Sequence, residues 1–171
     1  MSRAKPFRII AFDISASPGV AVVEIKSGKP KLKYAGSIKT DTSSPDSQRF
    51  AAVEALAIVA LHEYGPFNAV VREHFTKGSS KRSTQLVFGS WAMIDTALGR
   101  YGYSVDSEIT PSAVKKAVGG HGGADKSEVE TGVRRIMKLS DDYTFVSNDA
   151  SDAAAIALAY AIQNGLIKTE G

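Results

Sequence analysis

The chain has 171 residues, of which 43% are hydrophobic and 23% are charged, with a net charge of +3. These values are typical of one soluble globular domain, here expected to span residues 1–171. The absence of cysteine excludes disulfides and thiolate metal sites and fits a reducing cytoplasm. The apolar run near the N-terminus is too short for a signal peptide or a membrane span.

The first part of the chain predicts a three-stranded meander. The run FRIIAFDI at 7–14 is short, apolar and rich in β-branched residues, which is typical of a buried strand. After the turn SASPG, the segment VAVVEIK at 20–26 predicts a second strand, and KLKYAGSIK at 31–39 alternates like a third. Consecutive strands joined by tight turns favour antiparallel pairing.

A helix and a fourth strand are expected next. Ser44-Pro45 reads as an N-cap followed by proline at the first helical position, so the helix is predicted to begin there. Apolar residues then recur at helical spacing until Gly65-Pro66 ends the segment. The run FNAVVREHF at 67–75 is apolar at first and then abruptly polar, which predicts a strand that ends at a polar edge.

The remainder of the chain alternates helices with one further strand. A loop is expected at 77–84, a helix at 85–102 and a fifth strand at 103–110. Further helices are expected over 111–118, 125–139 and 147–162. This order predicts an α/β fold in which a mixed five-stranded sheet carries helices on both faces.

Four acidic residues lie where apolar strands end or where an apolar helix begins. Asp13 closes the first strand, Glu73 closes the fourth, and Asp149 and Asp152 begin the last helix. A charge in such a place costs free energy unless it is paired. The two aspartates also share a helix face, where like charges repel. If the first and fourth strands are neighbours, all four carboxylates meet at one end of the sheet.

A divalent cation would relieve this repulsion. Ligation by oxygen alone suits Mg²⁺ or Mn²⁺, and two such ions about 3.5–4 Å apart can support phosphodiester hydrolysis. Simpler explanations stay open at this stage. Asp13 could form a turn, and Glu73 could pair with Arg72 or Lys77. The two helical aspartates could serve only to complement the helix dipole.

Four stretches of the chain, in order, resemble the motifs of the RuvC family of Holliday junction resolvases, which have a ribonuclease-H-like fold. The stretches are IIAFDI, VVREHF, TPSAVKKAVGGHGGADKSEVETGVRRIM and SNDASDAAAIALAYAI. The third and fourth are specific, whereas the first two would be weak alone. The resemblance covers most of the chain.

The resemblance implies a nuclease with two Mg²⁺ ions, for which Mn²⁺ can substitute. The residues in the family's metal-ligand positions are Asp13, Glu73, Asp149 and Asp152. Lys115 and Lys126 fall in its two lysine positions and are expected to contact the scissile strand, and Lys126 also to steady charge on the phosphate. Phe75 matches an aromatic residue that stacks on bases at the open junction. Family members act as two-fold dimers on branched DNA, so a homodimer is expected.

One departure from the family pattern is plain. The family follows its first aspartate directly with a glycine turn, whereas ISASPG delays the glycine here to Gly19. An inherited cleavage-sequence preference therefore does not follow from the resemblance. Divergent phage-encoded relatives are one source compatible with this departure, so the resemblance implies the cytoplasm of a bacterial cell or of a phage-infected host as the location.

Basic residues near the glutamate motif suggest contacts to DNA. Lys77, Lys81 and Arg82 lie in a small-residue segment without acids, which suits phosphate neutralisation beside an aromatic residue. Lys115 and Lys116 are adjacent on a helix and point in two directions, so only one need face DNA. Trp91 is expected in the core, with a dimer interface as the alternative from the resemblance.

The leading hypothesis is a Mg²⁺-dependent endonuclease that resolves four-way junctions by symmetric nicking. One alternative is a catalytically inactive module that binds branched DNA. The other is a fragment of an actin-like phosphotransferase, for which the chain is too short to hold the two domains and glycine-rich phosphate loops required.

Overall fold

The computed structural model of the protein describes residues 5–168. Its strands are β1 (Phe7–Asp13), β2 (Gly19–Lys26), β3 (Lys29–Ser37), β4 (Ala69–Glu73) and β5 (Ser107–Ile109). Its helices are α1 (Asp46–Tyr64), α2 (Lys81–Arg100), α3 (Pro111–Gly119), α4 (Lys126–Met137) and α5 (Asn148–Gln163). Within the described residues, no helix is both long and apolar enough to cross a bilayer.

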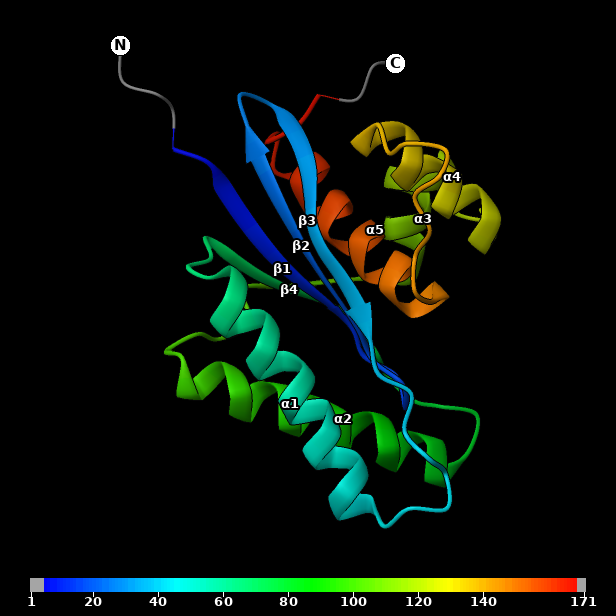
Figure 1. The fold of residues 1–171 in the computed structure, drawn as a ribbon. Coiled ribbons are helices and arrows are strands. Elements are labelled where there is room, and N and C mark those ends of the chain that lie inside the picture. Colours follow the sequence, from blue (N-terminus) through cyan, green and yellow to red (C-terminus); the bar gives the residue numbers. More distant parts are fainter. Residues whose placement is uncertain (1–4, 169–171) are drawn as a thin grey trace.

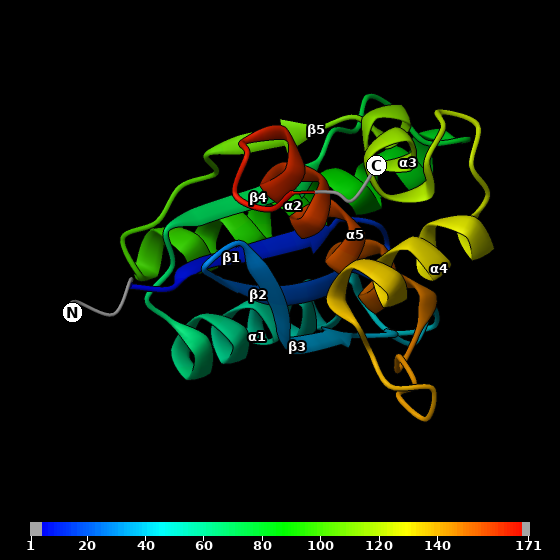
Figure 2. The same cartoon turned by 90° about the horizontal axis from the view of Figure 1, so that it is seen from above.

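The strands form one mixed sheet in the order β3-β2-β1-β4-β5, which can be followed across Figure 2. The first three strands pair antiparallel, as the predicted meander requires. β4 then pairs parallel with β1, and β5 pairs parallel with β4. The predicted mixed five-stranded sheet is therefore confirmed, and β1 and β4 are adjacent, which is the condition for the four acids to meet.

Helices cover both faces of the sheet, α1 and α2 on one and α3, α4 and α5 on the other (Figure 1). Side-chain alternation along β1 builds both cores, since successive residues of a strand point to opposite faces. Ile10 and Phe12 pack with α1 and α2, whereas Ile9 and Ala11 pack with α5.

Helix α5 is the centre of the second layer because it packs against the sheet on one side and against α3 and α4 on the other. Its alanines are fully buried, and their small side chains allow close approach on every side. A helix that is apolar on all sides is expected to be buried. The two acids at the N-terminal end of α5 are therefore unusual and need an explanation.

Three predicted boundaries of helices and strands are wrong. Pro45 occupies the N-cap position of α1 and Ser44 does not cap it, so the helix begins at Asp46. α2 begins at Lys81, inside the predicted loop, because Ser80 and Ser83 form a reciprocal capping box. The predicted strand at 103–110 shortens to three residues.

Candidate active site

The ends of β1 and β4 place two of the predicted acids side by side. The parallel register pairs Ala11 with Val71 and Phe12 with Arg72, so Asp13 and Glu73 are the next residues of the two strands. Ala11 and Val71 both face α5, and alternation directs Asp13 and Glu73 to that face too. The sheet therefore delivers both carboxylates to the helix that carries the other two.

The N-terminal end of α5 does not need either aspartate as a cap. Ser147 is the N-cap, and its hydroxyl accepts a hydrogen bond from the Ala150 backbone N–H at 3.2 Å. The Ser147 hydroxyl also lies 2.6 Å from that of Ser37, which ties the helix to β3. Asp149 lies in the first turn, where an acid complements the dipole. Dipole compensation does not account for Asp152 one turn further along.

The structure shows why the glycine that follows the first motif is Gly19, six residues after Asp13. It begins β2, pairs with Asp13 and lies directly under the first turn of α5. A Cβ built on Gly19 would meet the Asp149 carbonyl oxygen at 2.0 Å, far inside van der Waals contact. Only glycine lets the backbone of α5 come this close to the sheet, and that approach sets the position of Asp149.

The four acids line one cavity of about 330 Å³. Carboxylate oxygens of Asp13, Asp149 and Asp152 all lie within 4.8 Å of one another. Glu73 lines the same cavity but stands outside this tight group of three. The predicted meeting of the four positions at one end of the sheet agrees with the geometry.

The electrostatics of the cavity are unfavourable for the charged forms of its acids. Burial, and then the neighbouring charges of Glu73, Asp152 and Asp149, raises the pKa of Asp13 well above its ordinary value. Burial followed by repulsion from Asp152 raises the pKa of Glu73. The pKa of Asp149 is also raised, mainly by burial. Within residues 5–168, neither Asp13 nor Glu73 accepts a side-chain hydrogen bond, so Asp13 does not act as a turn former.

Lys126 is the basic residue in direct contact with the acids. Its Nζ donates a hydrogen bond to Asp152 Oδ2 at 3.0 Å, and this bond raises the pKa of the lysine. The Lys126 side chain is 71% exposed, so it can leave Asp152 without disturbing the core. The ammonium group therefore occupies a position where a cation is favoured.

Arg72, one residue before Glu73, is engaged elsewhere. Its guanidinium forms ion pairs with Glu108 at 2.7 Å and Asp95 at 3.2 Å, and its carbon lies 3.8 Å from the centroid of the Trp91 ring. The alternative that Arg72 neutralises Glu73 is therefore wrong. Glu73 stays available to the cavity.

The two adjacent lysines of α3 separate as the helical spacing predicts. Lys115 is half-buried and lines the cavity with the four acids. Lys116 is exposed and is not among the residues that line it. The fold thus selects Lys115 as the one that faces the acids.

The basic segment after β4 does not line the cavity. Phe75 is half-buried and packs edge-on against Phe88 and Trp91, with ring centroids 5.5 and 6.4 Å apart. Lys77 and Lys81 are exposed. Arg82 pairs with Asp46 of α1, so part of its charge is already compensated within the chain.

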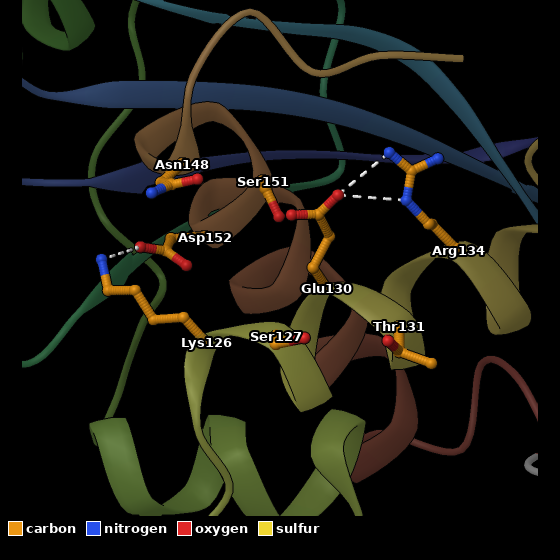
Figure 3. Close-up of a pocket in the computed structure, with 8 residues that line it drawn as sticks. All are labelled: Lys126, Ser127, Glu130, Thr131, Arg134, Asn148, Ser151 and Asp152. Carbon is orange, nitrogen blue, oxygen red and sulfur yellow. Dashed lines mark hydrogen bonds and ion pairs between the residues drawn. The ribbon is translucent and has the colours of Figure 1, made fainter. Parts of the chain in front are cut away.

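A second, polar hollow adjoins the cavity at the Lys126–Asp152 pair, and Figure 3 shows the residues that line it. It lies between α4 and α5 and shares those two residues with the cavity. Glu130 and Arg134 line it as an ion pair at 2.9 Å. Two acids and two bases balance its charge, whereas the four acids of the cavity outnumber the two lysines that line it.

Comparison with known proteins identifies the family. The family model for the crossover junction endodeoxyribonuclease RuvC matches residues 13–160. The RuvC of Rickettsia massiliae is 31% identical over 144 residues, which is 84% of this chain and 88% of the relative. The RuvC of a Synechococcus strain is 30% identical over 152 residues, which is 88% of this chain and 96% of the relative.

A solved structure agrees over nearly the whole chain. The structure of Thermus thermophilus RuvC in complex with a Holliday junction substrate superposes with a TM-score of 0.81 at 28% identity, covering 95% of this chain and 98% of that one. The fold and the acidic cavity thus define a ribonuclease-H-like nuclease, an enzyme of the phosphodiester hydrolase class. The chain belongs to the RuvC family of crossover junction endodeoxyribonucleases.

Two residues that shape the site were not recognised from the sequence. Ser147 carried a signal, since serine just before an apolar helix is a common N-cap. The role of Gly19 had no local signal, because the backbone it approaches lies 130 residues further along the chain.

Proposed function

We propose that this protein is a Mg²⁺-dependent, structure-selective endonuclease that resolves four-way DNA junctions by paired, symmetric nicking. The observation that carries the proposal is the gathering of three carboxylates within 4.8 Å, next to Glu73, in one cavity. The family supplies the substrate class, since the curated relatives are crossover junction endodeoxyribonucleases.

The residues present fit a site for divalent cations. All four acidic ligands offer hard oxygen atoms, which suits Mg²⁺ and Mn²⁺ rather than zinc. Asp13 is half-buried, and within residues 5–168 its carboxylate accepts no hydrogen bond. Burial and the neighbouring acids raise its pKa, and a carboxylate in such a place is stabilised by a cation or a proton. We propose two ions, held by Asp13, Glu73, Asp149 and Asp152.

The chain's own groups define the remaining roles. When bound, the ions would supply Lewis acidity toward the phosphate and lower the pKa of the attacking water. Lys126 is placed to exchange Asp152 for a phosphate oxygen once a cation takes over the carboxylate, and Lys115 adds a second positive charge at the wall. The charge-balanced hollow beyond Lys126 suits the sugar and base next to the scissile phosphate.

A direct test uses a four-way junction labelled on each strand in turn, incubated with Mg²⁺, Mn²⁺ or chelator. We expect nicks on two opposed strands at related positions, only with metal, and no cutting of a linear duplex of the same sequence. Tight binding of the junction without any metal-dependent product would instead identify an inactive binding module.

Metal binding is expected to strengthen as the pH rises. The pKa values of Asp13, Glu73 and Asp149 are raised, so protons compete with the cation at acidic pH and are released when it binds. Calorimetric titration with Mn²⁺ in buffers of different ionisation enthalpy would report both the affinity and the released protons. An affinity that does not rise at all between the ordinary carboxylate pKa of about 4 and neutral pH would contradict the assigned ligands.

Replacing Lys126 by methionine is expected to move metal affinity and catalysis in opposite directions. Removal of the ammonium that pairs with Asp152 should strengthen Mn²⁺ binding by a few-fold, whereas cleavage at saturating metal should fall by about 10²-fold. Mn²⁺ titration and single-turnover cleavage measure the two effects. Lys116→Met is the control and should change neither; a parallel loss of both quantities in Lys126→Met would contradict the exchange role.

The adjacent lysines of α3 offer a matched pair for DNA binding. We expect Lys115→Ala to weaken junction binding and to reduce the salt dependence by about one counterion, because Lys115 lines the cavity. Lys116→Ala should leave both quantities near the wild-type values. Gel-shift titrations over a series of salt concentrations measure the difference, and equal effects of the two changes would be inconsistent with the proposed path of the scissile strand.

We also propose that the protein is a homodimer, because its proposed substrate is two-fold symmetric. A four-way junction needs two cuts on opposed strands, and a two-fold dimer presents two equivalent sites. Exposed apolar side chains on the α1–α2 layer, Val59 and Phe88, support this proposal. Sedimentation velocity over a range of concentrations tests it.

A further inference from the structure

A groove with an apolar floor lies at the end of the molecule opposite the acidic cavity. The turn between β2 and β3, the last turn of α4 and the segment after α5 enclose it, with a volume of about 470 Å³. Pro30, Ile136, Met137 and Ile167 supply its apolar surface. Met137 and Ile167 belong to the core of the α5 layer, so the floor is rigid.

The rim of the groove is basic. Lys29, Arg135, Lys138 and Lys168 line it, and all four are exposed. None of the residues that line the groove is acidic, and within residues 5–168 none of these four cations forms an ion pair. Among the described residues, four positive charges without an ion-pair partner thus converge on one apolar hollow.

The backbone conformation determines where two of these basic residues lie. Lys138 is the C-cap of α4 in the left-handed conformation, with φ of 51°. Lys29 follows the two-residue Ser27-Gly28 turn, whose positive φ values are those of a tight hairpin. Arg135 and Lys138 complement the dipole of α4, but Lys29 and Lys168 lie on other segments, so helix stabilisation does not explain the set.

We infer that this groove is a docking site for an acidic peptide segment of a protein partner, with carboxylates against the rim and one or two large apolar side chains on the floor. Charge complementarity selects an anionic occupant. The apolar floor selects a peptide over a DNA backbone, whose contacts are made to phosphate and sugar. This inference is independent of the proposed nuclease activity.

Docking there would leave the acidic cavity open. Lys126 at the start of α4 lines the cavity, whereas Arg135 and Lys138 lie 9 and 12 residues further along. At 1.5 Å per residue, the two sites are about 15 Å apart along the helix. A partner bound at the groove could therefore recruit the protein to DNA without competing with the substrate for the acidic cavity.

The test uses the full chain and a fluorescein-labelled peptide, Asp-Glu-Asp-Leu-Asp-Phe-Glu-Leu, in fluorescence anisotropy titrations at physiological salt. We expect a dissociation constant of about 10 µM. Arg135→Glu and Lys138→Glu should each weaken binding by about tenfold. Lys39→Glu, which reverses an exposed lysine outside the groove, is the matched control and should not weaken it.

Two further measurements test whether the occupant of the groove is an acidic peptide with apolar side chains or another anion such as DNA. The same peptide with serine in place of Leu and Phe should bind at least about tenfold more weakly, because it cannot use the floor. Junction cleavage by Arg135→Glu should equal that of the wild type. Equal binding of the serine peptide, displacement of the acidic peptide by a short DNA duplex, or loss of cleavage in Arg135→Glu would each overturn the inference.

Discussion

Replacing Asp13 by asparagine is expected to abolish junction cleavage while raising the melting temperature of the metal-free protein. The loss of cleavage should be about 10³-fold or more, because Asp13 is one of the three carboxylates that lie within 4.8 Å of one another in the cavity. Junction binding should persist, since the lysines stay in place. Single-turnover cleavage and gel shift on the same preparation measure the two properties.

The gain in stability follows from the sign of the pKa shift. The folded-state pKa of Asp13 is raised, so the folded protein holds this proton more tightly than the unfolded chain does. As the pH rises from the ordinary aspartate value of about 3.9 through the folded-state pKa, the wild type loses stability that the asparagine variant keeps. In chelator near neutral pH, we expect the melting temperature to rise by about 3 °C.

Asp141 provides a matched control for this experiment. It is exposed between α4 and α5, and Asp141→Asn should change neither the melting temperature nor cleavage. Added Mg²⁺ should stabilise the wild type and the Asp141 variant but have little effect on Asp13→Asn. A metal-free Asp13→Asn protein that melts below the wild type would contradict the proposed crowding of negative charge.

Replacing Gly19 by alanine is expected to damage both the fold and the site, although alanine adds a single methyl group. The new Cβ would lie 2.0 Å from the Asp149 carbonyl oxygen and 3.0 Å from the Ala150 nitrogen, both backbone atoms that cannot rotate away. The start of α5 must therefore shift from the sheet. We expect a loss of about 2–3 kcal/mol in the free energy of unfolding and at least about 10²-fold in cleavage, because Asp149 moves with the helix.

Gly99→Ala is the control for the Gly19 change. Gly99 lies in α2, and a Cβ added there meets nothing within 4 Å. Alanine should stabilise that helix by about 0.5 kcal/mol and leave cleavage unchanged. Denaturant unfolding and cleavage assays on both variants test the contrast. Wild-type stability and activity in Gly19→Ala would show that the approach of α5 to β2 is not needed.

Much of the site followed from the sequence because strand ends and helix starts are local signals. Once β1 and β4 are parallel neighbours, Asp13 and Glu73 must lie together, and the apolar length of α5 buries that helix against the same face. The convergence of the acids thus depended on one condition that the sequence left open, the adjacency of β1 and β4.

Long-range contacts account for what the sequence did not predict. The segment 77–84 has the small polar residues of a loop, yet α2 begins within it, and the ion pair of Arg82 with the distant Asp46 holds this first turn against α1. β5 is short because the Asp106 carboxylate accepts the Val70 backbone N–H at 2.7 Å, in the place of a strand partner. Neither partner could be inferred from neighbouring residues.

A crystal structure grown with Mn²⁺ near neutral pH, with anomalous diffraction data, would show whether metal ions occupy the acidic cavity. We expect anomalous peaks within coordination distance of the carboxylates of Asp13, Asp149 and Asp152, with Lys126 released from Asp152. Manganese bound elsewhere on the molecule, with no peak in this cavity and the Lys126–Asp152 pair intact, would contradict it.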